Sequence, residues 1–283
     1  MVKEIAKRKT MSEEELRREA EVHFNQARVY NKKGELAAAV TAYQTAEKLF
    51  GELGAERERT RCWSGMGKAY GKRKEFVQAA AAFNEAAHHA VLAQWPDKEI
   101  EVCYNLGLTL QQMGLKSGSL EQVNEAIEAF QRGLIIAQRI EDQTSAGVLQ
   151  LSLGFACAWA KQTQEAIGYF ETAIPHALVG ADFDTAFSAL SSLGVLLSNN
   201  GRAAEAIPYY QQALELAKSE QGDIVAVADT YANLGVAYEK AGQLDEAIEA
   251  MDTYREILQR AGDLRLKEAT AMVKRLKNKA KLR

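Results

Sequence analysis

The chain contains few residues that interrupt helices and shows no pattern typical of strands. Only three of its 283 residues are proline, at Pro96, Pro175 and Pro208, so long helices can continue without a break. No segment alternates β-branched residues in the way that a strand does. Alanine, glutamate, leucine, glutamine and lysine dominate the composition, and all five favour helices. The sequence therefore predicts an all-α protein.

Cysteine and net charge are also low. The three cysteines, Cys62, Cys103 and Cys157, are widely spaced and form no CxxC pair, which favours a reduced, intracellular setting over a disulfide framework. The 35 Lys and Arg residues nearly balance the 38 Asp and Glu residues, for a net charge of −3. A dedicated nucleic-acid-binding protein usually carries a strong basic excess, so no nucleic-acid partner is expected.

Long apolar segments are missing. No stretch of about 18 apolar residues is present, so no membrane span is expected, and the charged residues 1–20 lack the apolar region of a secretory signal. The sequence predicts a cytoplasmic protein, and a cytoskeletal or ciliary localisation stays open. Residues 1–10 are expected to be mobile. Ser12 and Glu15 have the spacing of a capping box, so the first helix is predicted to begin there.

Motifs of common enzyme and metal sites are missing as well. Neither a phosphate-binding glycine loop nor an HExxH sequence occurs. His88 and His89 are adjacent, so on a helix they point apart, which suits a single metal poorly. No cysteine lies at ligand spacing from them or from His23 and His176. We therefore expect no catalytic residues, no metal and no cofactor.

The sequence does contain a repeat of about 40 residues, which is a period typical of helical solenoids. Each unit has a small residue, a turn, an alanine, a large residue four positions later and a second small residue. The first small residues are Ala27, Gly67, Gly107, Gly154, Gly194 and Gly235. The alanines are Ala39, Ala79, Ala126, Ala166, Ala206 and Ala247. The large residues are Tyr43, Phe83, Phe130, Phe170, Tyr210 and Met251.

This pattern has a physical basis. Two antiparallel helices joined by a tight turn approach closely only where their side chains are small, and the large residue is expected to fill the gap to the next unit. One such hairpin cannot bury its apolar face alone, so neighbouring units must stack. The predicted turn glycines are Gly34, Gly114, Gly201 and Gly242.

The pattern resembles the tetratricopeptide repeat over about residues 20–260. Trp63, Tyr30, Tyr70 and Tyr238 match further aromatic positions of that family. The resemblance implies an all-α, right-handed superhelical solenoid of antiparallel helix pairs that binds other proteins and is not an enzyme. The period exceeds the family's basic 34 residues. Repeats of this longer period are similar to those of cell-polarity adaptors and of kinesin light chains. The sequence does not assign the chain to either group.

The sequence departs from the family pattern in the third and fourth repeats. About seven extra residues around Leu115–Gln122 are expected to lengthen the turn of the third repeat. Cys157 stands where tyrosine is usual, and no glycine marks the turn that follows it. Pro175 falls inside an expected helix, which it should kink or shorten.

The last 21 residues are predicted to form a basic capping helix, so the chain divides into a charged segment 1–18, a solenoid 19–262 and a helix 263–283. The apolar stripe of this helix is Leu264, Leu266, Ala269, Met272, Val273 and Leu276. Its basic residues are Lys267, Lys274, Arg275, Lys277, Lys279, Lys281 and Arg283. Two interpretations stay open: a solvated polar face, or a contact for an acidic partner such as a tubulin tail or a membrane surface.

The resemblance also implies a binding surface, because the first helix of each repeat lines a concave groove in that family. The matching positions are Asn25, Arg28, Lys32, Lys68, Lys72, Tyr104, Asn105, Leu151, Phe155, Trp159 and Asn233. Cations in the first two repeats favour an acidic peptide, and a groove-facing tryptophan is a natural binding hot spot. Phe24 and Arg28 replace the lysine and asparagine of the clamp that holds chaperone tails, so that ligand is not expected.

These observations favour an adaptor that binds a peptide or helix of another protein in its groove. One alternative is a structural subunit of a large assembly, for instance ciliary or involved in transport. A second alternative is a membrane-fusion adaptor similar to the SNAP family, which also stacks helices at about this length.

Overall fold

The computed structural model describes residues 11–219 and 223–282, and every regular element in these ranges is an α-helix. Residues 1–10, for which we expected mobility, lie outside the described residues. The contacts between Cα atoms separate the chain into two compact units, Met1–Asp142 and Gln143–Arg283. Each unit is described by itself.

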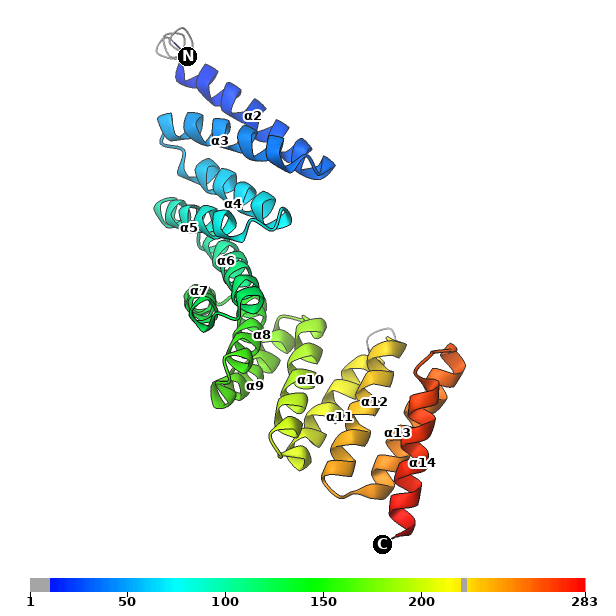
Figure 1. Cartoon of the computed structure of the whole chain (residues 1–283). Helices are drawn as coiled ribbons and strands as arrows, with labels where there is room; N and C mark the ends of the chain where they lie inside the picture. Colours follow the sequence, from blue (N-terminus) through cyan, green and yellow to red (C-terminus); the bar gives the residue numbers. More distant parts are fainter. Residues whose placement is uncertain (1–10, 220–222, 283) are drawn as a thin grey trace. The chain divides into compact units, whose positions relative to one another are not determined.

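Both units consist of helices joined by short turns (Figure 1). The first unit contains α2 (Glu13–Lys33), α3 (Leu36–Glu52), α4 (Glu56–Lys72), α5 (Phe76–Leu92), α6 (Pro96–Ser117) and α7 (Leu120–Arg139). The second contains α8 (Gln143–Trp159), α9 (Thr163–Val179), α10 (Phe183–Asn199), α11 (Ala203–Ser219), α12 (Ile224–Lys240), α13 (Leu244–Ala261) and α14 (Leu266–Lys281).

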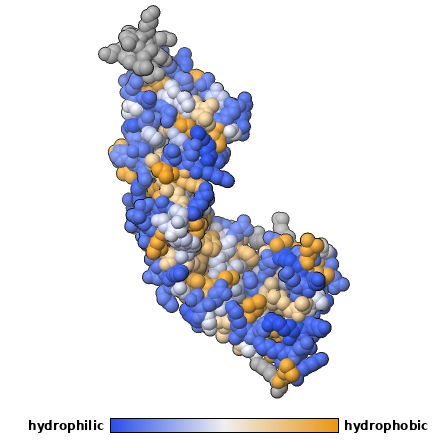
Figure 2. Space-filling view, viewed as in Figure 1, coloured by the Kyte–Doolittle hydropathy of each residue, from blue (hydrophilic) through white to orange (hydrophobic). Residues whose placement is uncertain are grey.

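The contacts between helices follow the order of the chain. Within each unit, every helix packs against the next one, and α2 also contacts α4, α8 contacts α10 and α10 contacts α12. The first helices of neighbouring repeats therefore lie side by side. This arrangement confirms the predicted all-α solenoid of antiparallel helix pairs. Figure 2 shows that the hydrophilic surface of each unit is interrupted by separate apolar patches.

The two helices of most repeats touch where glycine faces a large side chain. A Cβ atom on Gly107 would lie 2.5 Å from Cε1 of Phe130, and one on Gly194 would lie 2.6 Å from Cε1 of Tyr210. Each large residue therefore packs on the backbone of its own repeat. That it also fills the gap to the next unit stays a prediction for these repeats. A van der Waals contact of this kind has no room for even one more carbon.

Tyr43 in the first repeat is different. Its own repeat carries Ala27 where the others carry glycine, and its ring reaches Gly65 of the following repeat, where a Cβ would lie 2.5 Å from Cζ. Phe24 packs edge-on against the same ring, with 5.7 Å between the ring centroids. Tyr43 thus joins two repeats, as the sequence predicted.

The described turns between helices share one backbone conformation. Each passes through one residue in the left-handed region: Gly34, Gly54, Lys74, Gln94, Gly118, Glu141, Lys161, Ala181, Gly201, Gly242 and Gly262. The following residue donates its N–H to a carbonyl five positions earlier, as from Glu35 to Tyr30 at 2.9 Å and from Gln243 to Tyr238 at 2.9 Å. This is the Schellman closure of a helix end. Gly34, Gly201 and Gly242 are confirmed as turn glycines.

Gly114 is not a turn residue, so that prediction is wrong. It is buried inside α6, where a Cβ would lie 2.5 Å from Cγ2 of Val123. The extra residues of the third repeat extend the helices instead of the turn: α6 has 22 residues and α7 has 20, against 17 in α4. The turn itself is only Gly118 and Ser119.

Pro175 does not shorten its helix. α9 has 17 residues, the same number as α8, with Pro175 inside it. Proline removes one backbone donor, and near the end of a helix this costs a single hydrogen bond. Phe170, Ala173 and Ala177 are buried along the same helix, so packing holds this turn in place.

The two ends of the described chain agree in part with the predictions made from the sequence. The predicted capping box is confirmed, since Ser12 Oγ accepts from the N–H of Glu15 and the Ser12 N–H donates to Glu15 Oε2. At the other end, Leu264 precedes α14 and is 97% exposed, so its place in the apolar stripe is wrong. Met272 also stays partly exposed.

The remaining stripe residues of α14 do form a core. Ala269, Val273 and Leu276 are buried against Met251, Tyr254 and other residues of α12 and α13, and Leu266 packs at the edge of this cluster. α14 therefore covers the last repeat.

The glycine contact predicts opposite effects of the same substitution at two helical glycines of the second unit. Gly194→Ala places a methyl group against Tyr210 and should lower the free energy of unfolding by about 1–3 kcal/mol. Gly168→Ala meets no atom within 4 Å and should raise it by about 0.5–1 kcal/mol through helix propensity. Urea denaturation followed by circular dichroism measures both. Equal effects would contradict the proposed contact.

The left-handed turns make a second prediction. Ala181 has φ of 54° and is exposed, so Ala181→Gly should stabilise the fold by about 0.5–1 kcal/mol, because glycine adopts this conformation without strain. The control is Ala271→Gly, at an exposed position inside α14, which should destabilise by about 1 kcal/mol. Thermal unfolding of both variants shows whether each substitution raises or lowers the stability. A loss of stability in Ala181→Gly would contradict backbone strain at Ala181.

Candidate functional site

The predicted binding residues of the first unit lie on its first helices. Asn25, Arg28 and Lys32 are exposed on α2, and Lys68 and Lys72 are exposed on α4. Tyr104 and Asn105 are half-buried on α6. A cavity of about 400 Å³ lies among these helices and is lined by Asn31, Lys68, Lys72, Asn105, Leu108 and Gln112, with Phe76 and Phe83 of α5. It brings together three of the predicted residues, whereas Asn25, Arg28, Lys32 and Tyr104 do not line it.

Charges in this cavity are partly compensated within the chain. Lys68 Nζ and Lys98 Nζ each donate to the Glu101 carboxylate at 2.7 Å. Burial alone would raise the pKa of Glu101, but these two hydrogen bonds outweigh it and hold the pKa below its ordinary value. Lys72 Nζ donates to Asn31 Oδ1 at 3.2 Å. Lys72 has no acidic partner among the described residues, so it keeps its charge available to a ligand.

The predicted asparagine contact is also partly engaged. Asn105 Nδ2 donates to the carbonyl oxygen of Glu101 at 2.7 Å, which fixes the orientation of the amide. Its side-chain oxygen and its second amide N–H then remain to accept from and donate to a peptide.

The second unit carries the aromatic part of the prediction. On α8, Leu151 and Trp159 are half-buried and Phe155 is 44% exposed. The Phe155 ring packs edge-on against Phe170, with 5.3 Å between centroids, so it covers the core while presenting its other face to solvent. Asn233 is half-buried on α12 of the same unit.

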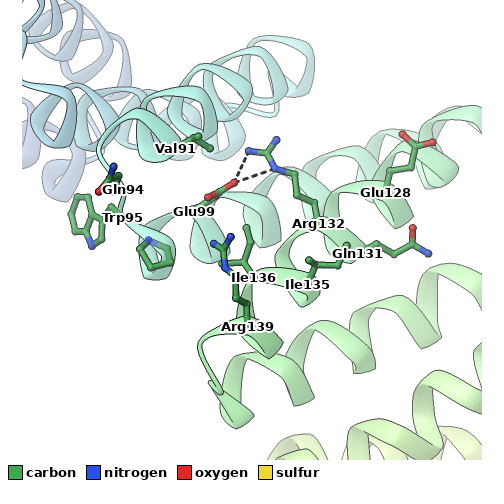
Figure 3. Close-up of a pocket in the computed structure, with 11 residues that line it drawn as sticks. Val91, Gln94, Trp95, Glu99, Glu128, Gln131, Arg132, Ile135, Ile136 and Arg139 are labelled. Carbon is green, nitrogen blue, oxygen red and sulfur yellow. Dashed lines mark hydrogen bonds and ion pairs between the residues drawn. The ribbon is translucent and has the colours of Figure 1, made fainter.

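A larger cavity, of about 610 Å³, was not predicted from the sequence. It lies between the end of α5, the beginning of α6 and α7, and Figure 3 shows Val91, Trp95 and Ile135 around it. Arg57 stacks on the ring of Trp95, 5.5 Å from its centroid. The missed signal was a pair of exposed aliphatic residues, Val91 and Ile135, on the second helices of two neighbouring repeats.

Polar groups in the interior are paired or neutral. His89 is buried and its Nδ1 lies 2.6 Å from Glu56 Oε2. Burial raises the pKa of the Cys103 and Cys157 thiols to about 11 in each case, so neither is a nucleophile at neutral pH. Within residues 11–219 and 223–282, no three His, Cys, Asp or Glu side chains are grouped to hold a metal ion. No helix in those ranges is long and apolar enough to cross a membrane.

The basic face of α14 makes contacts within the chain. Arg275 and Lys279 both donate to the carboxylate of Glu239, at 2.6 and 3.0 Å, and Lys277 pairs with Asp252 at 2.7 Å. These ion pairs tie α14 to α12 and α13. Lys267, Lys274 and Lys281 are exposed, and an acidic partner at this helix stays a prediction.

Comparisons with known proteins agree with this architecture. Models of the tetratricopeptide repeat match residues 20–51 and residues 185–260. These segments are the first repeat and the last two. The fold and the matched segments define a helical-repeat scaffold. The chain thus contains tetratricopeptide repeats in these two segments. No curated protein sequence matches it.

Solved structures of similar fold include three proteins of low sequence identity. BtubC (BKLC) from P. vanneervenii is 18% identical, over 89% of this chain and 93% of that one, with a TM-score of 0.61. A putative kinesin light chain from P. anserina is 19% identical, over 72% and 96%, with a TM-score of 0.56. A Rap protein complexed with competence and sporulation factor is 15% identical, over 93% and 75%, with a TM-score of 0.53.

The bridge from Glu239 to α14 predicts a pH-dependent contribution to stability. Burial alone would raise the pKa of Glu239, but hydrogen bonds from Arg275 and Lys279 lower it below the ordinary value of 4.5. Its contribution is therefore present above pH 4.5 and is lost as the pH falls through the depressed pKa. Glu239→Gln should cost about 1 kcal/mol at pH 7 and much less at pH 3.

Denaturant unfolding at the two pH values measures this difference. Glu246→Gln on α13 is the matched control, because Glu246 is exposed and has no ion pair among the described residues. A loss in Glu239→Gln that is the same at both pH values would contradict the ionic bridge.

Proposed function

We propose that this chain is a protein-interaction scaffold that holds a peptide or helix of a partner protein against the first helices of its repeats. The observation that carries the proposal is the cavity of about 400 Å³ among α2, α4 and α6, with Lys72 and Asn105 in its lining. A concave site with a few directed polar groups is the usual form of a binding site.

Charge favours an acidic ligand at the first unit. Arg28, Lys32 and Lys72 are exposed on this side and have no acidic partner among the described residues, while Glu101 offsets Lys68 and Lys98. The remaining positive charge attracts acidic segments and speeds their association. Arg61 lies over the Phe24 ring, 4.6 Å from its centroid, and adds a flat surface for an apolar side chain.

The second unit offers a different contact. The exposed face of Phe155 and the half-buried Leu151 and Trp159 lie along one side of α8. Large aromatic residues of this kind supply most of the binding free energy at protein interfaces. The Rap protein of similar fold is solved in complex with a factor, which supports ligand binding by this fold.

The experiment compares two double variants of equal net charge. Arg28→Glu with Lys72→Glu reverses two cations of the first unit's binding face. Lys48→Glu with Arg260→Glu reverses two exposed cations on α3 and α13 that do not line the cavity. Each tagged chain is used for affinity purification from cells of its source, with quantitative mass spectrometry of the bound proteins and circular dichroism to check helicity.

The proposal expects at least one protein to be lost about tenfold or more from the first double variant and retained by the second, since a reversed contact charge costs more than about 1.4 kcal/mol. Retention of every partner by both variants would refute binding at this face. Trp159→Ala, which should cost about 2–4 kcal/mol if Trp159 is a hot spot, tests the second unit in the same assay.

A further inference from the structure

The cavity of about 610 Å³ between α5, α6 and α7 belongs to a longer groove on the first unit. A neighbouring cavity of about 350 Å³ shares Glu128 and Arg132 with it and continues along α7 to Glu125, over Leu106 and Leu110 of α6 and beside Asn84 of α5. We call the combined lining of these two cavities the α5–α7 groove. None of its lining residues lines the cavity of the proposed function.

The walls of this groove expose aliphatic side chains to solvent. Ile135 on α7 is 67% exposed and Val91 on α5 is 50% exposed, and both line the groove with Trp95 and Ile136. Exposed aliphatic residues on both sides of a concave surface indicate an interaction site, because water contact with them is unfavourable.

The charges of the groove differ between its two ends. Arg139 lies at one end of the α7 wall and Glu128 toward the other, as Figure 3 shows. Among the described residues, neither Arg139 nor the acidic pair Glu125 and Glu128 has an ion-pair partner. Arg132, which lies between them in sequence, is already held by Glu99 at 3.0 Å. A ligand for this groove therefore needs a negative charge near Arg139 and a positive charge near Glu125 and Glu128.

A helix fits these features better than an extended peptide. Val91, Ile135 and Ile136 form an apolar part of the lining that offers no partners to the backbone N–H and C=O groups of an extended chain, whereas a helix satisfies its own backbone. Glu125 and Arg139 are 14 positions apart on α7, which corresponds to roughly 21 Å at 1.5 Å per residue. We propose that the α5–α7 groove binds an amphipathic helix of about four turns from a partner protein, with an acidic end at Arg139 and a basic end at Glu125 and Glu128.

The test uses the full chain and a synthetic 16-residue peptide, blocked at both ends and fluorescently labelled. Leucines occupy one face of its helix, with glutamates on the polar face of the first half and lysines on that of the second half. A control peptide has glutamine in place of the leucines. Fluorescence anisotropy at low salt gives the dissociation constants. The proposal expects saturable binding of the leucine peptide and at least tenfold weaker binding of the control.

Variants of the chain locate the contact. Ile135→Ala should weaken binding about tenfold or more, because it removes the most exposed apolar wall residue. Ile224→Ala is the matched control, since Ile224 is 61% exposed but lies on α12 of the other unit, and it should leave binding unchanged. Arg139→Glu should weaken binding to a similar extent and recover it toward a peptide whose glutamates are replaced by lysine.

Several outcomes would overturn the proposal. They are the absence of saturable binding to the wild-type chain, equal binding of the glutamine control, or full binding by both Ile135→Ala and Arg139→Glu. Arg28→Glu with Lys72→Glu separates this groove from the site of the proposed function, because that double variant should bind the peptide with unchanged affinity. A loss there would place the peptide in the other cavity and refute the α5–α7 groove.

Discussion

In every repeat but the first, the distance between the two helices is set by a glycine that lies against a large side chain and has no Cβ atom. Phe130 and Tyr210 pack directly on the backbone of the helix they face, and this contact places the helix axes close together. Everything else in a unit follows from that spacing: the buried alanines fit only at short range, and the outer side chains of the first helices are brought near one another across repeats. The geometry of the proposed binding surface therefore depends on a contact inside each repeat.

Much of this architecture could be read from the sequence because it is local. Gly194 and Tyr210 are 16 residues apart in one hairpin, and the recurrence of this spacing predicts that the helices cross at Gly194. The packing of Tyr210 on that glycine was not predicted, because the large residue was expected to fill the gap to the next unit. The position of Gly114 could not be predicted in this way, since a glycine serves equally well in a turn and in a tight helix crossing. Only the packing of Val123 against α6 distinguishes the two uses. The prediction that Leu264 belongs to the apolar stripe was wrong because Asp263 and Arg265 form a hydrogen-bonded turn there and the helix begins later.

The candidate sites were harder to predict because their chemistry connects distant residues. Lys68 looked like a free cation in its own repeat, but its partner Glu101 is 33 residues away. Glu239 similarly joins Arg275 and Lys279 of another helix. In both places one carboxylate bridges two cations, so the count of basic residues overstates the charge that a ligand would meet. Arg139 is different, and only the three-dimensional arrangement shows that it has no such bridge.

The recurring Schellman turn has a further consequence. The same backbone closure joins helices within a repeat and helices of successive repeats, as at Gly34 and Gly54, so the turns that the structure describes make no distinction between the two kinds of joint. The modular unit of the chain is then a single helix with its turn, and the forty-residue repeat is simply two modules long. An array built in this way can stop after an odd number of modules. α14 illustrates this, since it occupies the place where the first helix of a seventh repeat would lie.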